Sequence, residues 1–488
     1  IDENLRSRSR SLRRSLFRSS FGSSFRSSLR SKLLRQIFLP LGLLLIPFYS
    51  SHALTSQTTR NHIQGSAPYL TYDGGLTRAV DTDGLLSITL SNGVQYTPST
   101  NTSSSSEPIV LPVAGQSLAR VNMFVPVNTN SVTLTRLVDT YKYWGDNDGD
   151  TDVTATGGTL SLSVTDKYSR AVPRHTVLGH CGAPYRLKLT STDGTLSTRY
   201  GVPRSRSFNA SSVTYYVTPN PDTEPEVCFA KPVSVADADH NDGPSSIWNR
   251  YKGFFTQDTR PDYYGKNFPT TGANNMYFDL EIAGNSQLLA WSSVTQGGIT
   301  ATMSNPTPTS VRVTLTGPVA KASQWNSNNP GLIAKPTFPQ TFELIGHYAH
   351  NGERAVKYGF QIKQWFVNRG KGFYTYSNME SWCNKIGYRM PTVKDLTNAK
   401  RFEVIGATPS SPDNHYQRRI GASFIAEWGN LNKYEKADFG ITRFWTNVIA
   451  PDNDNRYVVY PEDGRIHWFY TGYESILEGL CTITAPEQ

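Results

Sequence analysis

Residues 374–392 read YTYSNMESWCNKIGYRMPT and contain the most strongly specified helix of the chain. Ser377 and Glu380 have the spacing of a capping box, in which the hydroxyl accepts an N–H from the first turn and the carboxylate reaches back. The apolar residues that follow have i, i+3, i+4, i+7 spacing: Met379, Trp382, Cys383 and Ile386. The pattern predicts a helix that begins at Ser377, buries one face and ends at Gly387.

The residues on either side of this helix favour a mixed α and β module. Strands are predicted before it at 342–347 and 356–367, and a second short helix is predicted after Pro391, where Thr392 and Asp395 repeat the capping pattern. Further along, Phe444-Trp445-Thr446-Asn447 precedes two alternating strands, 456–460 and 466–470. The turn Glu462-Asp463-Gly464-Arg465 separates those strands.

This order of elements over residues 363–484 resembles a C-type-lectin-like domain, in particular the tip domains of enterobacterial intimin- and invasin-type adhesins. In that fold a cysteine of the first helix pairs with one on the last strand, which implies a Cys383–Cys481 disulfide. The calcium-dependent lectins of the same fold carry Trp-Asn-Asp after an upstream Glu-Pro-Asn or Gln-Pro-Asp. This chain has Trp445-Thr446-Asn447 and no such tripeptide upstream, so the resemblance does not imply calcium-dependent sugar binding.

The region before this module is rich in short strand patterns. Period-2 alternation with turn residues between the runs predicts one or two Ig-like β-sandwich domains over 108–335, followed by the lectin-like module over 340–488. The expected fold class is therefore mainly β, ending in an α+β module. The predicted strands are 109–113, 119–125, 131–137, 159–164, 185–189, 213–217, 299–303 and 311–315.

Residues 54–107 are polar and rich in turns, and the run TSSSSE at 102–107 closes them. Serine-rich stretches are typical of flexible linkers. We therefore expect an N-terminal β-rich or linker segment over 54–107, with a domain boundary at its end.

The four cysteines are Cys181, Cys228, Cys383 and Cys481. An even number in an exported chain indicates disulfides, and the simplest connectivity is two sequential pairs, Cys181–Cys228 and Cys383–Cys481. A zinc site that includes Cys181 and His180 is a weaker alternative, because its other ligands would have to come from distant parts of the chain.

The N-terminal 53 residues have the pattern of a signal peptide with a long basic region. The first 36 residues hold ten of the 48 basic residues, an apolar run follows at 37–48, and small residues at Ser51 and Ala53 favour cleavage before Leu54. A basic nucleic-acid-binding arm is the alternative. It does not explain the apolar run and the cleavage pattern, and the rest of the chain is nearly neutral. We expect a secreted or outer-surface bacterial protein without nucleic-acid partners, and no transmembrane segment in the mature chain.

Aromatic residues are dense in the lectin-like region, and tyrosine and tryptophan dominate many binding interfaces. Packing in the module's own core is the alternative for each of them. The candidate ligand-binding residues are Trp428, Tyr434, Phe444, Arg465, Trp468, Tyr470 and Tyr473.

Alternate acidic residues at Asp146, Asp148, Asp150 and Asp152 could converge on a Ca²⁺ ion, the only cofactor that the sequence suggests. Glycine is absent from the sixth position of an EF-hand loop counted from Asp146, and glutamate is absent from the twelfth. A solvated acidic turn is the other interpretation.

No sequence motif indicates catalysis: the chain lacks a Gly-x-Ser-x-Gly elbow, a P-loop, His-Glu-x-x-His and a dinucleotide fingerprint. Formylglycine-generating enzymes share the lectin-like fold but need a reactive cysteine pair, and both cysteines of this module are used by its expected disulfide. We expect a non-catalytic exported adhesin that binds a protein or glycan on a cell surface or matrix. The alternative is a self-assembling subunit of an extracellular fibre or surface layer that binds copies of itself.

Overall fold

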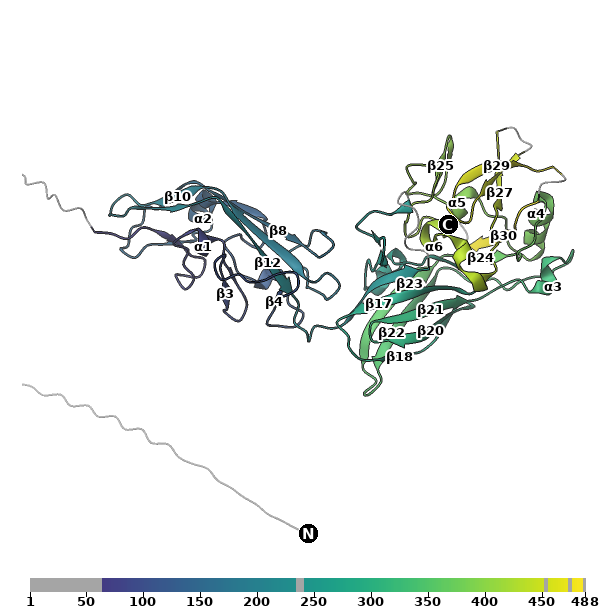
Figure 1. Ribbon diagram of the computed structural model, residues 1–488, viewed down its shortest axis with the longest axis horizontal. Helices are drawn as coiled ribbons and strands as arrows, with labels where there is room; N and C mark the ends of the chain where they lie inside the picture. The colour runs from purple at the N-terminus through teal and green to yellow at the C-terminus, as the bar shows by residue number, and fades with distance from the viewer. Residues whose placement is uncertain (1–63, 234–240, 452–454, 473–475, 486–488) are drawn as a thin grey trace, which may run out of the picture. The chain divides into compact units, whose positions relative to one another are not determined.

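The computed structural model describes residues 64–233, 241–451, 455–472 and 476–485 (Figure 1). The expected signal peptide, residues 1–53, and the candidate Tyr473 lie outside the described residues. No helix within the described ranges is long and apolar enough to cross a membrane.

The first part of the described chain is a β-sandwich with one hydrophobic core. Leu162 and Leu187 of a five-stranded sheet share that core with Leu196 and Phe208 of a three-stranded sheet. In sheet order the strands are β4 (Ile109–Val110), β12 (Ser211–Thr218), β9 (Tyr185–Ser191), β8 (Thr159–Thr165) and β5 (Ser131–Thr133), and then β11 (Ser205–Phe208), β10 (Gly194–Ser197) and β7 (Thr154–Gly157). Shorter elements complete this part: β1 (Tyr69–Leu70) pairs with β6 (Trp144–Gly145), β2 (Ile88–Thr89) pairs with β3 (Gln95–Tyr96), and the helices are α1 (Thr82–Leu85), η1 (Leu118–Arg120) and α2 (Leu134–Asp139).

The domain boundary expected at residue 107 is wrong. Leu70, Leu86 and Ile88 belong to the same core as the strands that follow. The serine-rich stretch is fastened along β12, because Asn101 Nδ2 donates to the carbonyl of Thr214 at 2.8 Å. The Ser103 hydroxyl also accepts the N–H of Tyr216 at 3.0 Å. A segment whose polar side chains hydrogen-bond to a neighbouring strand has the same composition as a flexible linker, so composition alone could not distinguish the two.

A second β-sandwich begins at β13. Its core joins a seven-stranded sheet to a three-stranded sheet, and the rings of Phe278 and Phe360 lie 5.8 Å apart across it. The first sheet, in order, contains β14 (Trp248–Asn249), β15 (Gly253–Phe255), β13 (Glu226–Pro232), β17 (Met276–Ala283), β21 (Ser310–Thr316), β20 (Ile299–Thr307) and β19 (Val294–Gln296). The second contains β18 (Leu289–Trp291), β22 (Gln340–Tyr348) and β23 (Arg354–Ile362), and the helices of this part are η3 (Pro261–Lys266) and α3 (Ala322–Trp325).

The boundary expected at residue 340 is also wrong, because β22 and β23 complete this second sandwich by pairing with each other and with β18. The C-terminal α+β module begins near residue 363. Its strands are β16 (Thr271–Ala273), β24 (Gln364–Asn368) and β30 (Leu480–Thr484) in one sheet, β27 (Phe444–Ile449), β28 (Asn455–Val459) and β29 (Ile466–Tyr470) in another, and the hairpin β25 (Lys400–Arg401) and β26 (Val404–Ile405). Its helices are α4 (Tyr376–Lys385), α5 (Val393–Leu396), α6 (Phe424–Trp428), η4 (Leu431–Lys433) and η5 (Glu435–Ala437).

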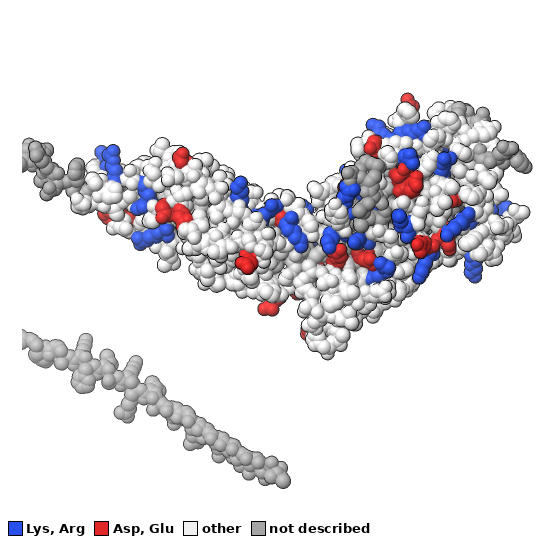
Figure 2. Space-filling model, viewed as in Figure 1, with Lys and Arg blue, Asp and Glu red and all other residues white. Residues whose placement is uncertain are grey.

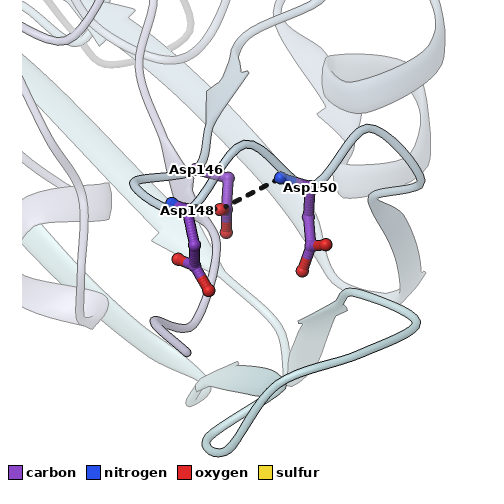
Figure 3. Close-up of side chains that lie close together, drawn as sticks. All are labelled: Asp146, Asp148 and Asp150. Atoms are coloured by element: carbon purple, nitrogen blue, oxygen red, sulfur yellow. Dashed lines mark hydrogen bonds between the residues drawn. The ribbon is translucent and has the colours of Figure 1, made fainter. Parts of the chain in front are cut away.

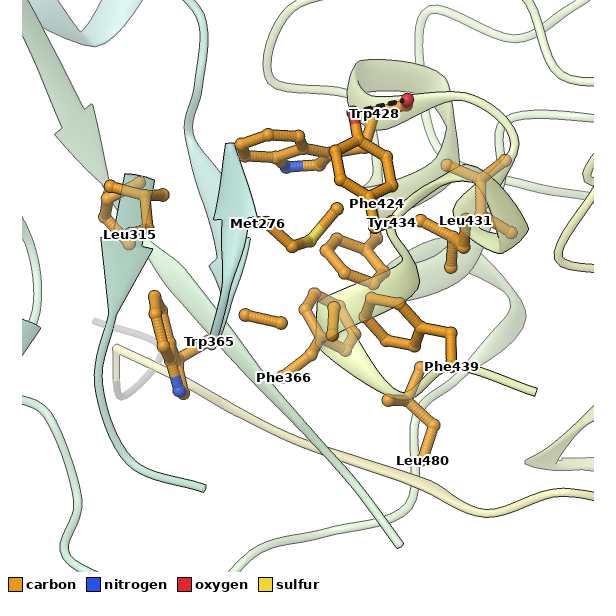
Figure 4. Packing of buried hydrophobic residues seen from close by; sticks show 14 of the residues in the cluster. Met276, Leu315, Trp365, Phe366, Phe424, Trp428, Leu431, Tyr434, Phe439 and Leu480 are labelled. Carbon is orange, nitrogen blue, oxygen red and sulfur yellow. Dashed lines mark hydrogen bonds between the residues drawn. The ribbon is translucent and has the colours of Figure 1, made fainter. Parts of the chain in front are cut away.

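The second sandwich and the C-terminal module share one continuous core. Met276 and Leu315 of the sandwich belong to the same cluster as Phe366, Phe424 and Trp428 of the module, and Figure 4 shows Met276 beside Trp428. Strand β16 comes from the sandwich segment of the chain yet pairs in parallel with β24 of the module. The chain is mainly β, with β-sandwich domains followed by an α+β module, as the sequence predicted.

The helix predicted at 377–387 is present, but it begins earlier. Helix α4 covers Tyr376–Lys385, and its N-cap is Thr375, whose hydroxyl accepts the N–H of Asn378 at 3.4 Å. The C-terminus is as expected: Gly387 has φ +85°, and Tyr388 N–H donates to the carbonyl of Cys383 at 2.9 Å. These are features of a Schellman motif. All four residues of the predicted apolar stripe are buried.

Most of the predicted strands are present, with two exceptions before residue 140. Residues 119–125 contain the end of η1 and one isolated bridge, between Asn122 and Thr89, but no strand. Residues 131–137 begin as β5 but turn into α2 at Leu134, because the Thr133 hydroxyl caps a helix by accepting the N–H of Arg136 at 3.2 Å. Leu134, Leu137 and Val138 then face the core with helical spacing.

Both disulfides join the sequential pairs that were expected. Cys383 on α4 bonds to Cys481 on β30, with their Cα atoms 5.6 Å apart. Cys181 bonds to Cys228, with a Cα separation of 5.2 Å. The Cys181–Cys228 disulfide does not lie within one sandwich. It joins the loop before β9 to β13, which is the first strand of the following sandwich.

Candidate binding surface of the C-terminal module

Strands β27, β28 and β29 form an antiparallel sheet in that order, with β29 at one edge. The turn predicted at 462–465 connects β28 to β29. Tyr460 N–H donates to the carbonyl of Arg465 at 3.1 Å, and Gly464 takes the left-handed conformation at φ +69°. The turn therefore fixes the register in which Ile466 lies opposite Val459.

Three of the predicted ligand-binding aromatics are core residues, so the prediction is wrong for them. Trp428, Tyr434 and Phe444 are each at most 1% exposed. Trp428 Nε1 donates to the carbonyl of Thr271 at 3.0 Å, and the Tyr434 hydroxyl donates to the carbonyl of Trp428 at 3.2 Å. Burial raises the pKa of Tyr434 far above its usual range. Trp428 and Tyr434 hold the module to the sandwich, since their rings pack against Phe278 and Tyr277.

Two of the predicted aromatics lie on the surface. Trp468 is 46% exposed and Tyr470 is 59% exposed, and both are on the edge strand β29. Arg465, at the start of the strand, is paired with Asp463 at 2.6 Å. Contact of these residues with a ligand stays a prediction.

The hairpin of β25 and β26 adds surface residues that the sequence did not single out. Phe402, at its turn, is 86% exposed and has a positive φ of 49°. Between this hairpin and the start of β29 lies a groove of about 410 Å³, lined by Lys400, Arg401 and His467 among others. The only signal in the sequence was a phenylalanine flanked by charges in Lys400-Arg401-Phe402-Glu403.

Together these residues form a surface that we call the β29 surface: Lys400, Arg401, Phe402, His467, Trp468 and Tyr470. The ring of His467 lies 5.7 Å from that of Trp468, which connects the groove to the exposed part of the strand. On the face shown in Figure 2, basic and acidic side chains are interspersed.

A buried carboxylate, that of Glu427, joins the module to the second sandwich. Glu427 on α6 is fully buried and accepts hydrogen bonds from the backbone N–H groups of Thr270, Thr271 and Gly421 at 2.9–3.0 Å. The two threonine hydroxyls also donate to it, at 2.8 and 2.7 Å. Burial raises the pKa of Glu427, and the hydrogen bonds oppose that shift. Nothing in the sequence distinguished this glutamate from a surface residue.

The second predicted capping box is present at the start of α5. Thr392 N–H donates to Asp395 Oδ2 at 2.6 Å, and Asp395 N–H donates to the Thr392 hydroxyl at 3.2 Å. Asp395 is also paired with Arg389 at 2.7 Å. Burial raises the pKa of Asp395, but the hydrogen bonds from Arg389 and Thr392 outweigh burial, so its net pKa is lowered.

The acidic turn of the first sandwich brings three of the four predicted aspartates together (Figure 3). One oxygen each of Asp146, Asp148 and Asp150 lies within 4.8 Å of the others, and Asp152 is not part of the group. Asp146 Oδ1 accepts the N–H of Asp148 at 2.9 Å. The hydroxyl and backbone N–H of Ser66 donate to Asp148 and lower its pKa. Much of this carboxylate group is thus used in shaping the turn, and calcium binding stays a prediction.

Parts of this chain are similar to known proteins. No protein-family model matches the chain. The inverse autotransporter adhesin YeeJ of Escherichia coli (strain K12) is 25% identical over 172 residues, a match that covers 34% of this chain and 6% of YeeJ. The match is therefore a small part of that relative's length.

Two solved structures are similar to parts of this chain. One is invasin, described as a bacterial integrin-binding protein, with a TM-score of 0.34, 14% identity, and coverage of 71% of this chain and 54% of invasin. The other is the C-terminal 282-residue fragment of intimin in complex with the intimin-binding domain of the translocated intimin receptor. Its TM-score is 0.31 at 11% identity, and the match covers 69% of this chain and all of the fragment. The resemblance of this chain to enterobacterial intimin- and invasin-type adhesins is confirmed.

Proposed function

We propose that the chain is an exported bacterial adhesin that acts at the outer surface. Its C-terminal lectin-like module binds a protein or glycan on a cell surface or matrix by surface complementarity, and no bond is made or broken. The similarity to the adhesin YeeJ supports the class of function.

The observation that carries the proposal is the β29 surface. Exposed tryptophan, tyrosine and phenylalanine beside cationic groups are the residue types that dominate binding energy at protein interfaces. Trp468, Tyr470 and Phe402 are all well exposed, whereas Trp428, Tyr434 and Phe444 of the same module are buried. Exposed aromatic side chains on the edge strand and on the neighbouring hairpin suit recognition of a partner.

The test is binding of the mature chain to host epithelial cells and to protein and glycan arrays. We expect the double variant Trp468→Ala/Tyr470→Ala to lose most binding while its circular dichroism spectrum stays unchanged, because both side chains are exposed. Tyr251→Ala is the matched control, since Tyr251 is 68% exposed on the second sandwich. Absence of binding by the folded, oxidised chain, or equal binding by the double variant, would contradict the proposal.

A further inference from the structure

The edge of β29 is open. Among the described residues, β29 pairs with β28 on one side and with no strand on the other. In an antiparallel pair, the backbone N–H and C=O groups of successive residues point alternately toward the partner strand and away from it. The residues whose groups point away can therefore be identified from the bonds that their neighbours make.

Two sets of contacts identify them. Ile466 N–H donates to Asn414 Oδ1 at 2.9 Å, and Asn414 Nδ2 donates back to the carbonyl of Ile466 at 3.0 Å, so the backbone of Ile466 faces away from β28. On the far side of β28, the carbonyl of Tyr457 accepts the Thr446 hydroxyl from β27 at 2.6 Å. Tyr457 thus faces β27, and its partner Trp468 faces outward.

The same alternation turns the N–H and C=O of Tyr470 outward. Asn414 already occupies the edge at Ile466, where Arg401 Nη1 also donates to the carbonyl at 3.0 Å. His467 Nδ1 lies 2.5 Å from the Trp468 carbonyl, so the open edge consists of the Trp468 N–H and the N–H and C=O of Tyr470. It ends at Ile466, where Asn414 and Arg401 bond to the backbone. Unpaired strand edges are templates for pairing with another chain.

The end of the open edge, beside Ile466, is positively charged. The groove beside Ile466 is lined by Lys400, Arg401, Arg465 and His467, and none of the described residues that line it is acidic. The guanidinium of Arg465 is already paired with Asp463, which leaves Lys400 and Arg401 as the main source of charge. A strand that runs antiparallel to β29 has its C-terminal end at this groove.

We propose that the module binds an extended polypeptide segment of its partner as an added antiparallel strand on β29. The N–H of Trp468 and the N–H and C=O of Tyr470 pair with the segment, and acidic residues at its C-terminal end bind beside Lys400 and Arg401. This inference rests on the proposed adhesin function and specifies its ligand: an acidic polypeptide rather than a glycan, because a glycan has no backbone amides to complete the edge.

The test uses the full mature chain and three synthetic peptides. The first peptide alternates Thr and Val over eight residues and ends in Asp-Asp; the second ends in Asn-Asn; the third carries Asp-Asp at its N-terminal end. We expect fluorescence polarisation to detect binding of the first peptide, binding about tenfold weaker for the other two, and a marked loss of binding at high salt.

The matched variants are Tyr470→Pro and Tyr470→Thr. Both substitutions remove the aromatic ring of Tyr470, but only proline also removes the outward backbone N–H. Proline is tolerated in an edge strand where that N–H faces solvent. We expect Tyr470→Pro to weaken binding of the first peptide about tenfold more than Tyr470→Thr does. Lys400→Glu should abolish the preference for Asp-Asp over Asn-Asn.

Strand addition is contradicted if none of the peptides binds, or if Tyr470→Pro and Tyr470→Thr bind the first peptide equally. If the unaltered chain binds cells, and Tyr470→Pro and Tyr470→Thr bind cells equally well, then strand addition is wrong but the adhesin function stands. Glycan-array binding that depends on Lys400 but not on the Tyr470 N–H would identify an anionic glycan as the ligand instead. Failure of the unaltered chain to bind cells counts against the adhesin function itself.

Discussion

Glu427 is the residue on which the joint between the second sandwich and the module most depends. Its buried carboxylate accepts three backbone N–H groups and two hydroxyls, all from the sandwich segment 270–271 or from the loop at Gly421. A carboxylate offers acceptors only, which suits a site that contains only donors. The side-chain amide of glutamine would place a donor against these donors.

We therefore expect Glu427→Gln to lower the free energy of unfolding by about 2 kcal/mol, the usual cost of leaving buried polar groups without partners. Urea unfolding followed by tryptophan fluorescence measures this change. Glu435→Gln is the control, because Glu435 is exposed. Equal effects of the two substitutions would show that the hydrogen bonds of Glu427 contribute little.

Asp395 makes the module sensitive to acid. Its pKa in the fold lies below the ordinary value of 3.8, because hydrogen bonds from Arg389 and Thr392 to the ionised form outweigh burial. A carboxyl group whose pKa is lowered by folding stabilises the fold above its unfolded pKa, and this contribution is lost as pH falls through the folded pKa. Unfolding free energies measured from pH 6 down to pH 2.5 should therefore fall less steeply below pH 4 in Asp395→Asn than in the unaltered chain. The exposed Asp262→Asn should leave the slope unchanged.

At the scale of single elements, helix α4 shows how far the sequence can be read. The apolar stripe and Gly387 predicted its buried face and its C-terminus correctly, because both follow from helical geometry alone. The start was predicted one residue late, since Ser377 and Thr375 are both good caps. Starting at Tyr376 lets its ring pack 5.9 Å from that of Trp445 and its hydroxyl donate to Glu380. That tertiary contact is not visible in the local sequence.

The N-cap can be tested directly. Thr375→Ala should destabilise the chain by about 1 kcal/mol, because it removes the hydroxyl that accepts the N–H of Asn378. Ser377→Ala lies inside the helix and should cost less, since alanine has the higher helix propensity. Thermal unfolding of the two variants distinguishes the two positions, and a larger effect at Ser377 would favour the capping box that the sequence predicted.

Strand β29 shows the opposite limit. Its alternation and its turn could be read from the sequence, but its place at the edge of a sheet could not, because strand order is set by long-range pairing. The same uncertainty explains why Trp428, Tyr434 and Phe444 were grouped with Trp468 and Tyr470. Composition gives the density of aromatics, whereas burial depends on which strands and helices cover them.

At the scale of the whole molecule, the described chain has two large hydrophobic cores. One lies in the first sandwich, and the other is shared by the second sandwich and the C-terminal module. A small third cluster of Cys228, Phe229 and Phe255, with Tyr168 and Cys181 against it, contains side chains from both sides of the connection. The sequence predicted strands in both sandwiches, but it did not show which of these strands share a core.

The Cys181–Cys228 disulfide joins these two cores covalently. It closes a segment with a sequence separation of 47 residues, for which the chain-entropy model gives about 4 kcal/mol of stabilisation. In the double variant Cys181→Ser/Cys228→Ser we expect two separate unfolding transitions in calorimetry, because only the small third cluster and a few polar contacts, such as that of the Cys181 N–H with Glu226, would still couple the cores. Binding through the C-terminal module should persist, since Cys383–Cys481 lies within that module. A single transition with unchanged midpoint would show that noncovalent contacts already join the two cores, and loss of binding would show that the first sandwich is needed for recognition.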